Sequence, residues 1–242
     1  MYLKAPRAAK EFARALRRHS AAFAGVDVAL MPPFPLIPVV AEALRGSKLE
    51  VGAQTLSAYE DGAHTGEVSA EMLKALGASA VIVGHSERRA EGETNDDVRE
   101  KLQRAARAGL KAVLCIGEKE RDASGDYVGF LTEQLSSALA GFPKASAGKL
   151  LIAYEPLWAI GKTAADAMKP AELRETSILI RKVVADALGR EALARVAVLY
   201  GGSVEPENAP ALIAGGDVSG FLVGHSSADV EPFLSIVKAC RL

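Results

Sequence analysis

The sequence predicts an α/β protein organised around a parallel, barrel-like sheet of seven strands. Short apolar runs recur along the whole chain of 242 residues, and such runs are typical of strands that are buried on both faces. Segments whose apolar residues have helical spacing follow these runs. Strands that alternate with helices in this way predict a parallel sheet with right-handed crossover connections.

The expected strands share an apolar run that ends at a glycine, a polar residue or a proline. They cover residues 26–31, 49–53, 80–84, 112–116, 150–154, 196–200 and 220–223. No linker or low-complexity segment interrupts the series, so a single barrel domain over residues 1–242 is expected.

The expected helices show apolar residues three or four positions apart. The first precedes all strands, with Ala9, Phe12, Leu16 and Phe23 on its apolar face and Lys10, Arg14, Arg17 and Arg18 on its polar face. An arginine-rich transit peptide is the alternative interpretation of this segment. Later helices are marked by Leu131, Leu135 and Leu139, by a run from Pro170 to Leu188, and by Val230, Phe233, Leu234 and Val237.

The composition excludes several classes of partner. The formal net charge is -1 and the sequence pI is about 6.5, which gives no basic surface for nucleic acid or an anionic membrane. No apolar run reaches the roughly 20 residues that span a bilayer. Cys115 and Cys240 lie far apart without metal-ligand spacing, so reduced thiols and a cytoplasmic location are expected.

Polar or glycine-rich clusters follow every expected strand. They occupy residues 32–34, 52–55, 84–89, 115–118, 155, 200–204 and 223–226. In a parallel barrel the carboxyl ends of all strands face one rim, and active sites are built on that rim. We therefore expect these clusters to surround one site.

Glu155 is a candidate catalytic base. It ends an apolar strand and is followed by Pro156, which lacks a backbone N–H and so ends strand pairing. Trp158 and Ile160 follow closely and would make the surroundings apolar, which raises the pKa of a carboxylate toward the range useful for proton abstraction. The alternative is a solvated glutamate at the end of a strand.

His85 is the candidate acid–base partner of Glu155, because it ends another strand on the same rim. A structural histidine is the alternative. The charged residues Glu87, Arg88 and Arg89 either orient this pair or form a solvated charge run.

Two glycine-rich turns, at residues 201–203 and 224–226, follow neighbouring late strands. Turns of this kind offer bare backbone N–H groups and commonly bind a phosphate in barrels. Either turn alone is also compatible with an ordinary loop.

Two further loops have features of functional segments. Residues 158–164 combine small hinge residues with an apolar body, as a mobile lid over the site does, although a plain surface loop is the alternative. Residues 56–67 show no helical or strand period, and a loop of this length in a compact domain is often an interface.

Taken together, six motifs resemble those of the triose-phosphate isomerase family, and the resemblance runs from Met1 to Leu242. They are VGAQ at 51–54, GAHTGE at 62–67, GHSERR at 84–89, CIGE at 115–118, AYEPLWAIG at 153–161 and YGGSV at 200–204. The resemblance implies a TIM barrel. It also implies an isomerase of glycolysis and gluconeogenesis that interconverts dihydroxyacetone phosphate and glyceraldehyde 3-phosphate without a cofactor or metal.

The resemblance also implies a role for each site residue. Glu155 would move the proton between two carbons, His85 would polarise the carbonyl group, and Ser86 and Glu87 would support them. The groups implied in binding the phosphate of the triose are Gly161, Ser203, Gly224 and His225. A homodimer or a larger homo-oligomer such as a tetramer is implied as well.

Three departures from the family pattern affect the expected site. The lid lacks the usual Thr-Gly after the position of Gly161 and carries extra residues at 165–168, so its closure is left open. His225 stands where the family has a second glycine, which would cost conformational energy if its φ were positive. Thr55 replaces the usual asparagine.

The front of the sequence departs furthest. The family opens with a strand that ends in Asn-Trp-Lys, whose lysine contacts the substrate phosphate. One register matches this lysine to Lys4, and the favoured register places residues 1–3 directly after the motif. In both registers the first strand is missing, because at most three residues precede Lys4 and a strand needs about five. We therefore expect an open barrel of seven strands, with edges that favour self-association, and reduced isomerase activity. The alternative is an inactive relative that binds phosphate or has a purely structural role.

Overall fold

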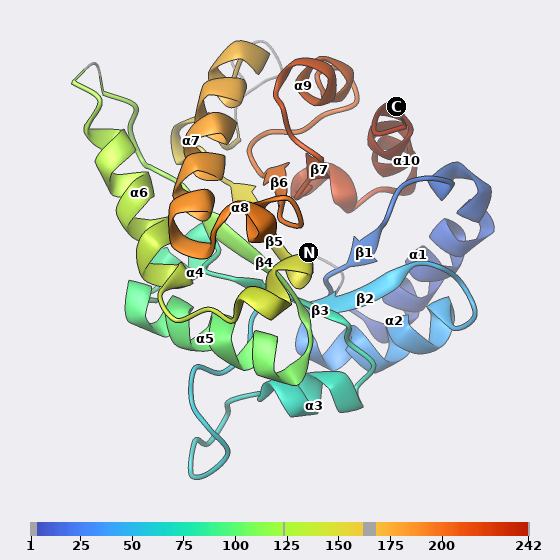
Figure 1. Ribbon diagram of the computed structural model, residues 1–242. Coiled ribbons are helices and arrows are strands. Elements are labelled where there is room, and N and C mark those ends of the chain that lie inside the picture. Colours follow the sequence, from blue (N-terminus) through green and yellow to red (C-terminus); the bar gives the residue numbers. More distant parts are fainter. Residues whose placement is uncertain (1–3, 123, 162–167, 242) are drawn as a thin grey trace.

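A single curved sheet of seven parallel strands forms the centre of the computed structural model, which describes residues 4–122, 124–161 and 168–241 (Figure 1). The strands are β1 (Ala29–Leu30), β2 (Glu50–Ala53), β3 (Ala80–Val83), β4 (Lys111–Ile116), β5 (Leu150–Tyr154), β6 (Ala197–Tyr200) and β7 (Gly220–Phe221). Their order in the sheet follows their order in the sequence, and every neighbouring pair is parallel. The predicted strand count and sheet type are confirmed.

The two edge strands are shorter than predicted. Residues 26–31 and 220–223 were expected to be strands, yet β1 and β7 comprise only two residues each. Each has a hydrogen-bonded neighbour on one side only, and no pairing joins β1 to β7 within the described residues. An edge strand makes backbone hydrogen bonds to one neighbour, whereas an inner strand makes them to two. Regular pairing is therefore shorter at the edges of the sheet. The expected open barrel of seven strands is confirmed.

Helices surround the outer face of this sheet (Figure 1). The α-helices are α1 (Pro6–Arg18), α2 (Ile37–Leu44), α3 (Ala70–Ala75), α4 (Ser86–Ala90), α5 (Asn95–Ala108), α6 (Asp126–Leu139), α7 (Pro170–Leu188), α8 (Arg190–Leu193), α9 (Ala209–Gly215) and α10 (Val230–Ala239). Short 3-10 helices are η1 (Ser20–Phe23), η2 (Phe34–Leu36), η3 (Lys144–Lys149), η4 (Leu157–Ala159) and η5 (His225–Ser227). None of the described helices has the length and apolar character that a membrane crossing requires.

Helix α1 is shorter than the sequence pattern suggested. Phe23 was expected on its apolar face, but α1 ends at Arg18 and Phe23 lies in η1. The backbone of His19 leaves the helical region, and its N–H donates to the Leu16 carbonyl oxygen at 2.9 Å. Phe23 is nevertheless buried. The apolar spacing therefore identified a core residue correctly but predicted the wrong end for the helix.

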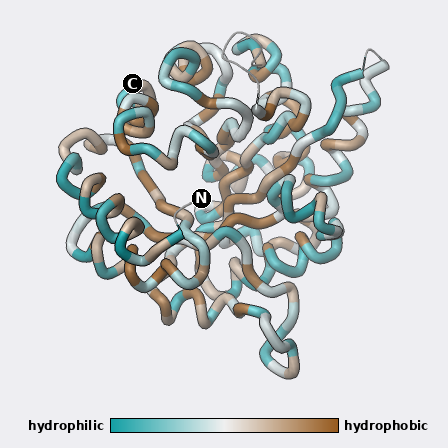
Figure 2. Tube along the Cα trace, turned by 180° about the vertical axis from the view of Figure 1, so that it is seen from behind, coloured by the Kyte–Doolittle hydropathy of each residue, from teal (hydrophilic) through white to brown (hydrophobic). Residues whose placement is uncertain are grey.

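The core has two layers, one on each face of the sheet. The larger layer lies between the sheet and the helices. The smaller layer lies inside the curve of the sheet, where Ile82, Val113, Cys115 and Ala153 are buried together. Successive strand residues point to opposite faces, so two apolar layers require continuous apolar runs. These runs form the hydrophobic centre of the molecule in Figure 2.

The segment between β2 and α3 extends away from the rest of the molecule (Figure 1). Residues 54–69 contain no helix or strand, as expected for the loop at 56–67. The rings of Tyr59 and His64 stack with their centroids 4.3 Å apart, and Glu60 accepts a hydrogen bond from Arg104 of α5 at 2.6 Å. The loop therefore has its own internal packing and one ionic anchor.

An ion pair between Lys101 of α5 and Glu93 lies almost out of contact with solvent. The two side chains are 9% and 3% exposed. The ammonium group of Lys101 also donates to the Thr55 hydroxyl at 3.2 Å. Thr55 thus serves as a hydrogen-bond acceptor at the position where the family has asparagine.

Replacing Lys101 is expected to destabilise the fold strongly, because a buried Glu93 carboxylate would lose its counter-charge. We predict that Lys101→Met lowers the free energy of unfolding by about 3–5 kcal/mol, measured by urea denaturation. Lys182→Met is the control, since Lys182 pairs with Asp186 at 3.2 Å with both side chains largely exposed. It should cost about 0–1 kcal/mol. Equal losses in the two variants would contradict the assignment of a buried pair.

Candidate active site

Glu155 directly follows β5 and lies between the ends of β4 and β6. Its backbone N–H donates to the Ile116 carbonyl oxygen at 2.8 Å, and the residue is 2% exposed. Glycines lie beside Glu155 at the ends of both neighbouring strands. A Cβ atom on Gly117 would come within 1.9 Å of the Glu155 carbonyl oxygen, and one on Gly201 within 3.0 Å of its Cγ. The close approach of β4 and β5 therefore requires glycine at position 117, and a side chain at position 201 would press on the Glu155 side chain.

The carboxylate of Glu155 is contacted by His85 and Ser86. Its Oε1 lies 3.1 Å from Nε2 of His85, and its Oε2 accepts a hydrogen bond from the backbone N–H of Ser86 at 3.0 Å. Burial raises the pKa of Glu155 above its usual value, while His85 and Ser86 act in the opposite direction. The structure thus brings together the two residues that the sequence suggested as an acid–base pair.

The hydrogen bonds of His85 assign its tautomer. Its Nδ1 accepts from the backbone N–H of Glu87 at 3.3 Å, at the start of α4. A ring nitrogen that accepts cannot carry the proton, so the proton of the neutral imidazole lies on Nε2. Nε2 faces the Glu155 carboxylate, and 29% of the His85 side chain remains exposed. The ring can therefore donate from Nε2 to an oxygen of a ligand beside Glu155.

The charged run after His85 divides into residues with different environments. The Glu87 side chain is 81% exposed and 3.9 Å from His85, so it is the backbone of Glu87 that contacts the imidazole. Arg88 pairs with Glu91 at 2.5 Å on the surface. Arg89 donates to the Gly84 carbonyl oxygen at 2.8 Å, and burial lowers its pKa. Of these three charged side chains, Arg89 is the one that contacts the backbone at the end of β3.

Glu118 and Cys115 are parts of the site to which the sequence assigned no role. Glu118 is 2% exposed, and its Oε1 accepts from the Tyr154 hydroxyl at 2.7 Å and from Trp158 Nε1 at 2.8 Å. Burial raises the pKa of the Cys115 thiol, and the neighbouring Glu155 carboxylate raises it further. The CIGE motif at 115–118 marked these residues in the sequence. Their roles could not be predicted from it, because their contacts are with residues about 40 positions away.

The predicted lid over residues 158–164 is only partly within the described residues. Its first part is anchored, because Trp158 donates to Glu118 and the Ala159 carbonyl oxygen accepts from the Ser203 hydroxyl at 2.9 Å. Ile160 is 44% exposed, whereas Trp158 is partly buried against the main hydrophobic core. Residues 162–167 lie outside the part of the chain that the structure describes.

The predicted phosphate-binding residues follow three neighbouring strands. Gly161 comes after β5, Ser203 after β6, and Gly224 and His225 after β7. Gly161 has φ 72, in the left-handed region that favours glycine. Asp217 is the only described residue other than glycine with positive φ, so His225 carries none of the strain considered for it. His225 and Gly224 are both exposed at the rim.

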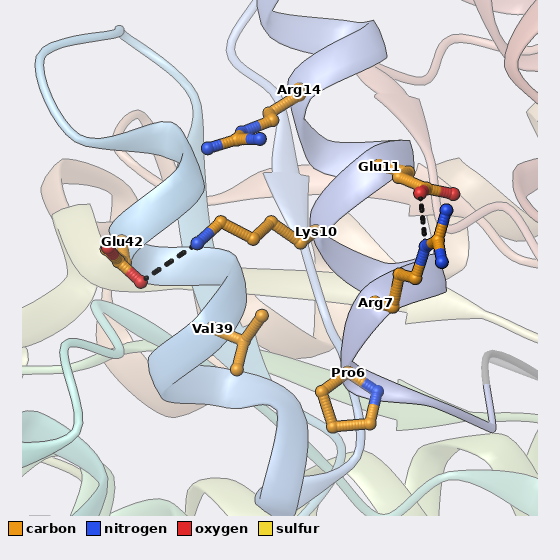
Figure 3. A pocket seen from close by; sticks show the side chains of 7 residues that line it. All are labelled: Pro6, Arg7, Lys10, Glu11, Arg14, Val39 and Glu42. Carbon is orange, nitrogen blue, oxygen red and sulfur yellow. Dashed lines mark hydrogen bonds and ion pairs between the residues drawn. The ribbon is translucent and has the colours of Figure 1, made fainter.

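A surface groove between α1 and α2 lies apart from these residues (Figure 3). It has a volume of about 450 Å³ and is lined by Pro6, Arg7, Lys10, Glu11, Arg14, Val39 and Glu42. Arg7 pairs with Glu11 at 2.9 Å, and Lys10 lies 3.5 Å from Glu42. These charges largely neutralise one another, and the groove contains no candidate base. Among the described residues, no cluster of His, Cys, Asp and Glu is arranged to hold a metal ion.

Comparison with known proteins agrees with this geometry. The family model described as triosephosphate isomerase matches residues 1–240. A triosephosphate isomerase of Carboxydothermus hydrogenoformans is 43% identical over 239 residues, covering 97% of this chain and 94% of that protein. Those of Alkalilimnicola ehrlichii and Thermus thermophilus are 44% and 41% identical, covering 89% and 88% of this chain and 86% and 85% of those proteins.

The burial of Glu155 predicts a pH-dependent effect on stability. Its pKa is raised on folding, so the unfolded chain loses this proton at a lower pH than the folded protein does. The free energy of unfolding therefore falls as pH rises from about 4.5 through the pKa of the folded state. Glu155→Gln removes this effect and is expected to unfold at higher urea concentration than the wild type at pH 8.

The difference between the two proteins should shrink as the pH is lowered toward 4.5. Glu207→Gln is the control, since Glu207 is exposed and makes no ion pair among the described residues. A Glu155→Gln variant that is less stable than the wild type at pH 8 would show that burial is not the dominant influence on this carboxylate.

Proposed function

The chain belongs to the triosephosphate isomerase family, and we propose that it interconverts dihydroxyacetone phosphate and glyceraldehyde 3-phosphate. The observation that carries this proposal is the contact between the buried Glu155 carboxylate and Nε2 of His85 at 3.1 Å. A carboxylate base beside a neutral imidazole donor suits a reaction that moves protons between adjacent carbons and oxygens. Triosephosphate isomerase is itself the standard example of a glutamate base paired with a neutral histidine.

The proposed reaction proceeds in two proton transfers at carbon. Glu155 takes a proton from the carbon beside the carbonyl group, while His85 donates from Nε2 to the carbonyl oxygen, which gives an enediol. Glu155 then returns the proton to the neighbouring carbon, and His85 recovers its proton from the other oxygen. Protons alone are moved, so the mechanism involves no cofactor. The raised pKa of Glu155 supports its role, since it makes the carboxylate a stronger base.

The phosphate of the triose would bind to the turns after β5, β6 and β7. Backbone N–H groups at Gly161, Gly224 and His225, together with Ser203, are proposed as its partners. Glu87 would act through its backbone N–H, which orients His85. Support comes from the common rim on which these residues lie, because late-strand turns in parallel barrels bind phosphate.

An inactive, phosphate-binding relative is the second candidate. It is favoured by one observation of the described residues: no pairing joins β1 to β7, so the sheet is open beside the turn after β7. Loss of one preorganised hydrogen-bond donor to a developing oxyanion costs on the order of 10²–10³ in rate. A coupled assay with glyceraldehyde 3-phosphate separates an isomerase of reduced activity from an inactive phosphate binder.

We further propose that residues 1–242 act as one barrel domain in the cytoplasm, within glycolysis and gluconeogenesis. The two cysteines are free, and Cys115 is buried beside Glu155, which suits a reducing compartment.

Glu155→Ala is expected to lower turnover by at least about 10²–10⁴-fold, the usual contribution of a positioned base. Binding of inorganic phosphate should change little, because the Glu155 carboxylate contacts His85 and Ser86 and none of the residues proposed to bind the phosphate. Turnover of glyceraldehyde 3-phosphate and phosphate binding by calorimetry are the two measurements. Glu207→Ala, an exposed substitution of the same type, is the control. Unchanged turnover in Glu155→Ala would rule out this residue as the base.

We propose a homodimer or a larger homo-oligomer such as a tetramer, and predict that the exposed loop at residues 54–69 takes part in it. Tyr59 in this loop is 53% exposed and stacks on His64, so the segment that extends from the molecule presents an aromatic pair on its surface. Tyr59→Ser is expected to weaken association at least about tenfold in sedimentation experiments, since aromatic anchors often carry about 2 kcal/mol or more.

Phe130→Ser on α6 is the matched control for this prediction, because Phe130 is 50% exposed but lies outside the loop. It should leave association unchanged. A wild-type protein that sediments as a monomer at micromolar concentration would contradict the proposed assembly.

A further inference from the structure

The turn after β7 is held by the sheet on one side only. β7 is an edge strand of two residues, and its backbone pairing with β6 ends where the N–H of Leu222 donates to the Tyr200 carbonyl oxygen at 2.9 Å. Beyond this point no backbone hydrogen bond joins the described residues of the turns at 201–205 and 223–226. The separation of these turns must therefore be set by side chains.

One side-chain hydrogen bond links the two turns within the described part of the chain. The Ser226 hydroxyl donates to Oε2 of Glu205 at 2.5 Å. A hydroxyl that donates to a carboxylate makes a short, charge-assisted bond, which is stronger than one between neutral groups. Ser226 is buried, at 6% exposure, so water competes little for this contact.

Glu205 is in turn fixed relative to Ser203. The backbone N–H of Glu205 donates to Oδ1 of Asn208 at 2.9 Å, and Nδ2 of Asn208 donates to the Ser203 carbonyl oxygen at 3.0 Å. A continuous chain of hydrogen bonds therefore runs from the backbone of Ser203 to the side chain of Ser226, the residue that directly follows His225.

We infer that Glu205 and Ser226 are positioning residues that fix the distance between the two phosphate-binding turns. The inference rests on the proposed function, since it assumes that Ser203, Gly224 and His225 bind the substrate phosphate. Donors on two separate turns can bind one phosphate well only if their spacing is held before the ligand arrives. The Glu205–Ser226 bond supplies this constraint where the sheet does not.

If Glu205 acted on the phosphate through its charge, its removal would change the phosphate affinity in the opposite direction. A carboxylate close to a phosphate dianion repels it, so removal of the charge alone would strengthen phosphate binding. Removal of a positioning contact would weaken it. The direction of the change in Glu205→Ala therefore separates the two roles.

The test is a double-mutant cycle on Ser226→Ala and Glu205→Ala, with KM, kcat and the Kd of inorganic phosphate as readouts. Loss of preorganised spacing lowers affinity because binding must then order the two turns, and a tenfold loss corresponds to about 1.4 kcal/mol. We expect each single variant to raise both KM and the phosphate Kd about tenfold, with kcat within about twofold of the wild type. The double variant should be no weaker than either single one, because both remove the same bond.

Two further variants distinguish positioning from a general loss of structure. Ser226→Thr keeps the hydroxyl group and is expected to restore most of the phosphate affinity. Ser235→Ala is the matched control, because its hydroxyl donates to the Glu231 carbonyl oxygen on α10, outside both turns. It should leave all three readouts unchanged.

Three outcomes would overturn the inference. They are wild-type phosphate affinity in Ser226→Ala, tighter phosphate binding in Glu205→Ala, and additive losses in the double variant. Failure of the proposed function looks different, because a wild-type protein without turnover and without phosphate binding would overturn that proposal and this inference together. A wild type that binds phosphate, beside a Ser226→Ala variant that binds it equally well, would overturn the inference alone.

Discussion

The close approach of three strand ends around the Glu155 carboxylate is the constraint on which the candidate site depends. Gly117 and Gly201 leave no side chain between β4, β5 and β6 at this level, so Glu155 can follow β5 without leaving the sheet. The same packing keeps water away and raises the pKa of Glu155. A base that is costly to bury is thus held by a backbone contact at Gly117 that no larger residue would permit.

The surrounding loops are organised by a small number of buried side-chain contacts. Glu118 joins Tyr154 at the end of β5 to Trp158, where the predicted lid begins. The Ser203 hydroxyl then connects the same segment to the turn after β6. The loops of neighbouring strands are therefore connected to one another by specific side-chain hydrogen bonds.

The sequence predicted features that depend on local pattern and missed features that depend on contacts across the sheet. The strand Leu150–Tyr154 and the helix Pro170–Leu188 were predicted with correct ends, because a doubly buried run and a first-turn proline are local signals. Phe23 was placed on the wrong element, since a polar segment ended α1 early. The Glu205–Ser226 bond spans 21 positions and has no periodic signature, so no pattern in the sequence identifies it.

The opening between β7 and β1 has unequal consequences for the two halves of the site. His85 and Glu155 follow β3 and β5, which are inner strands with neighbours on both sides. The pair that would transfer protons is thus held by an uninterrupted part of the sheet. Gly224 and His225 follow β7, the edge strand, where ladder hydrogen bonds hold one side alone. An open barrel should therefore disturb phosphate binding before it disturbs the acid–base geometry, and a side-chain bond between the turns after β6 and β7 strengthens the structure at its weaker end.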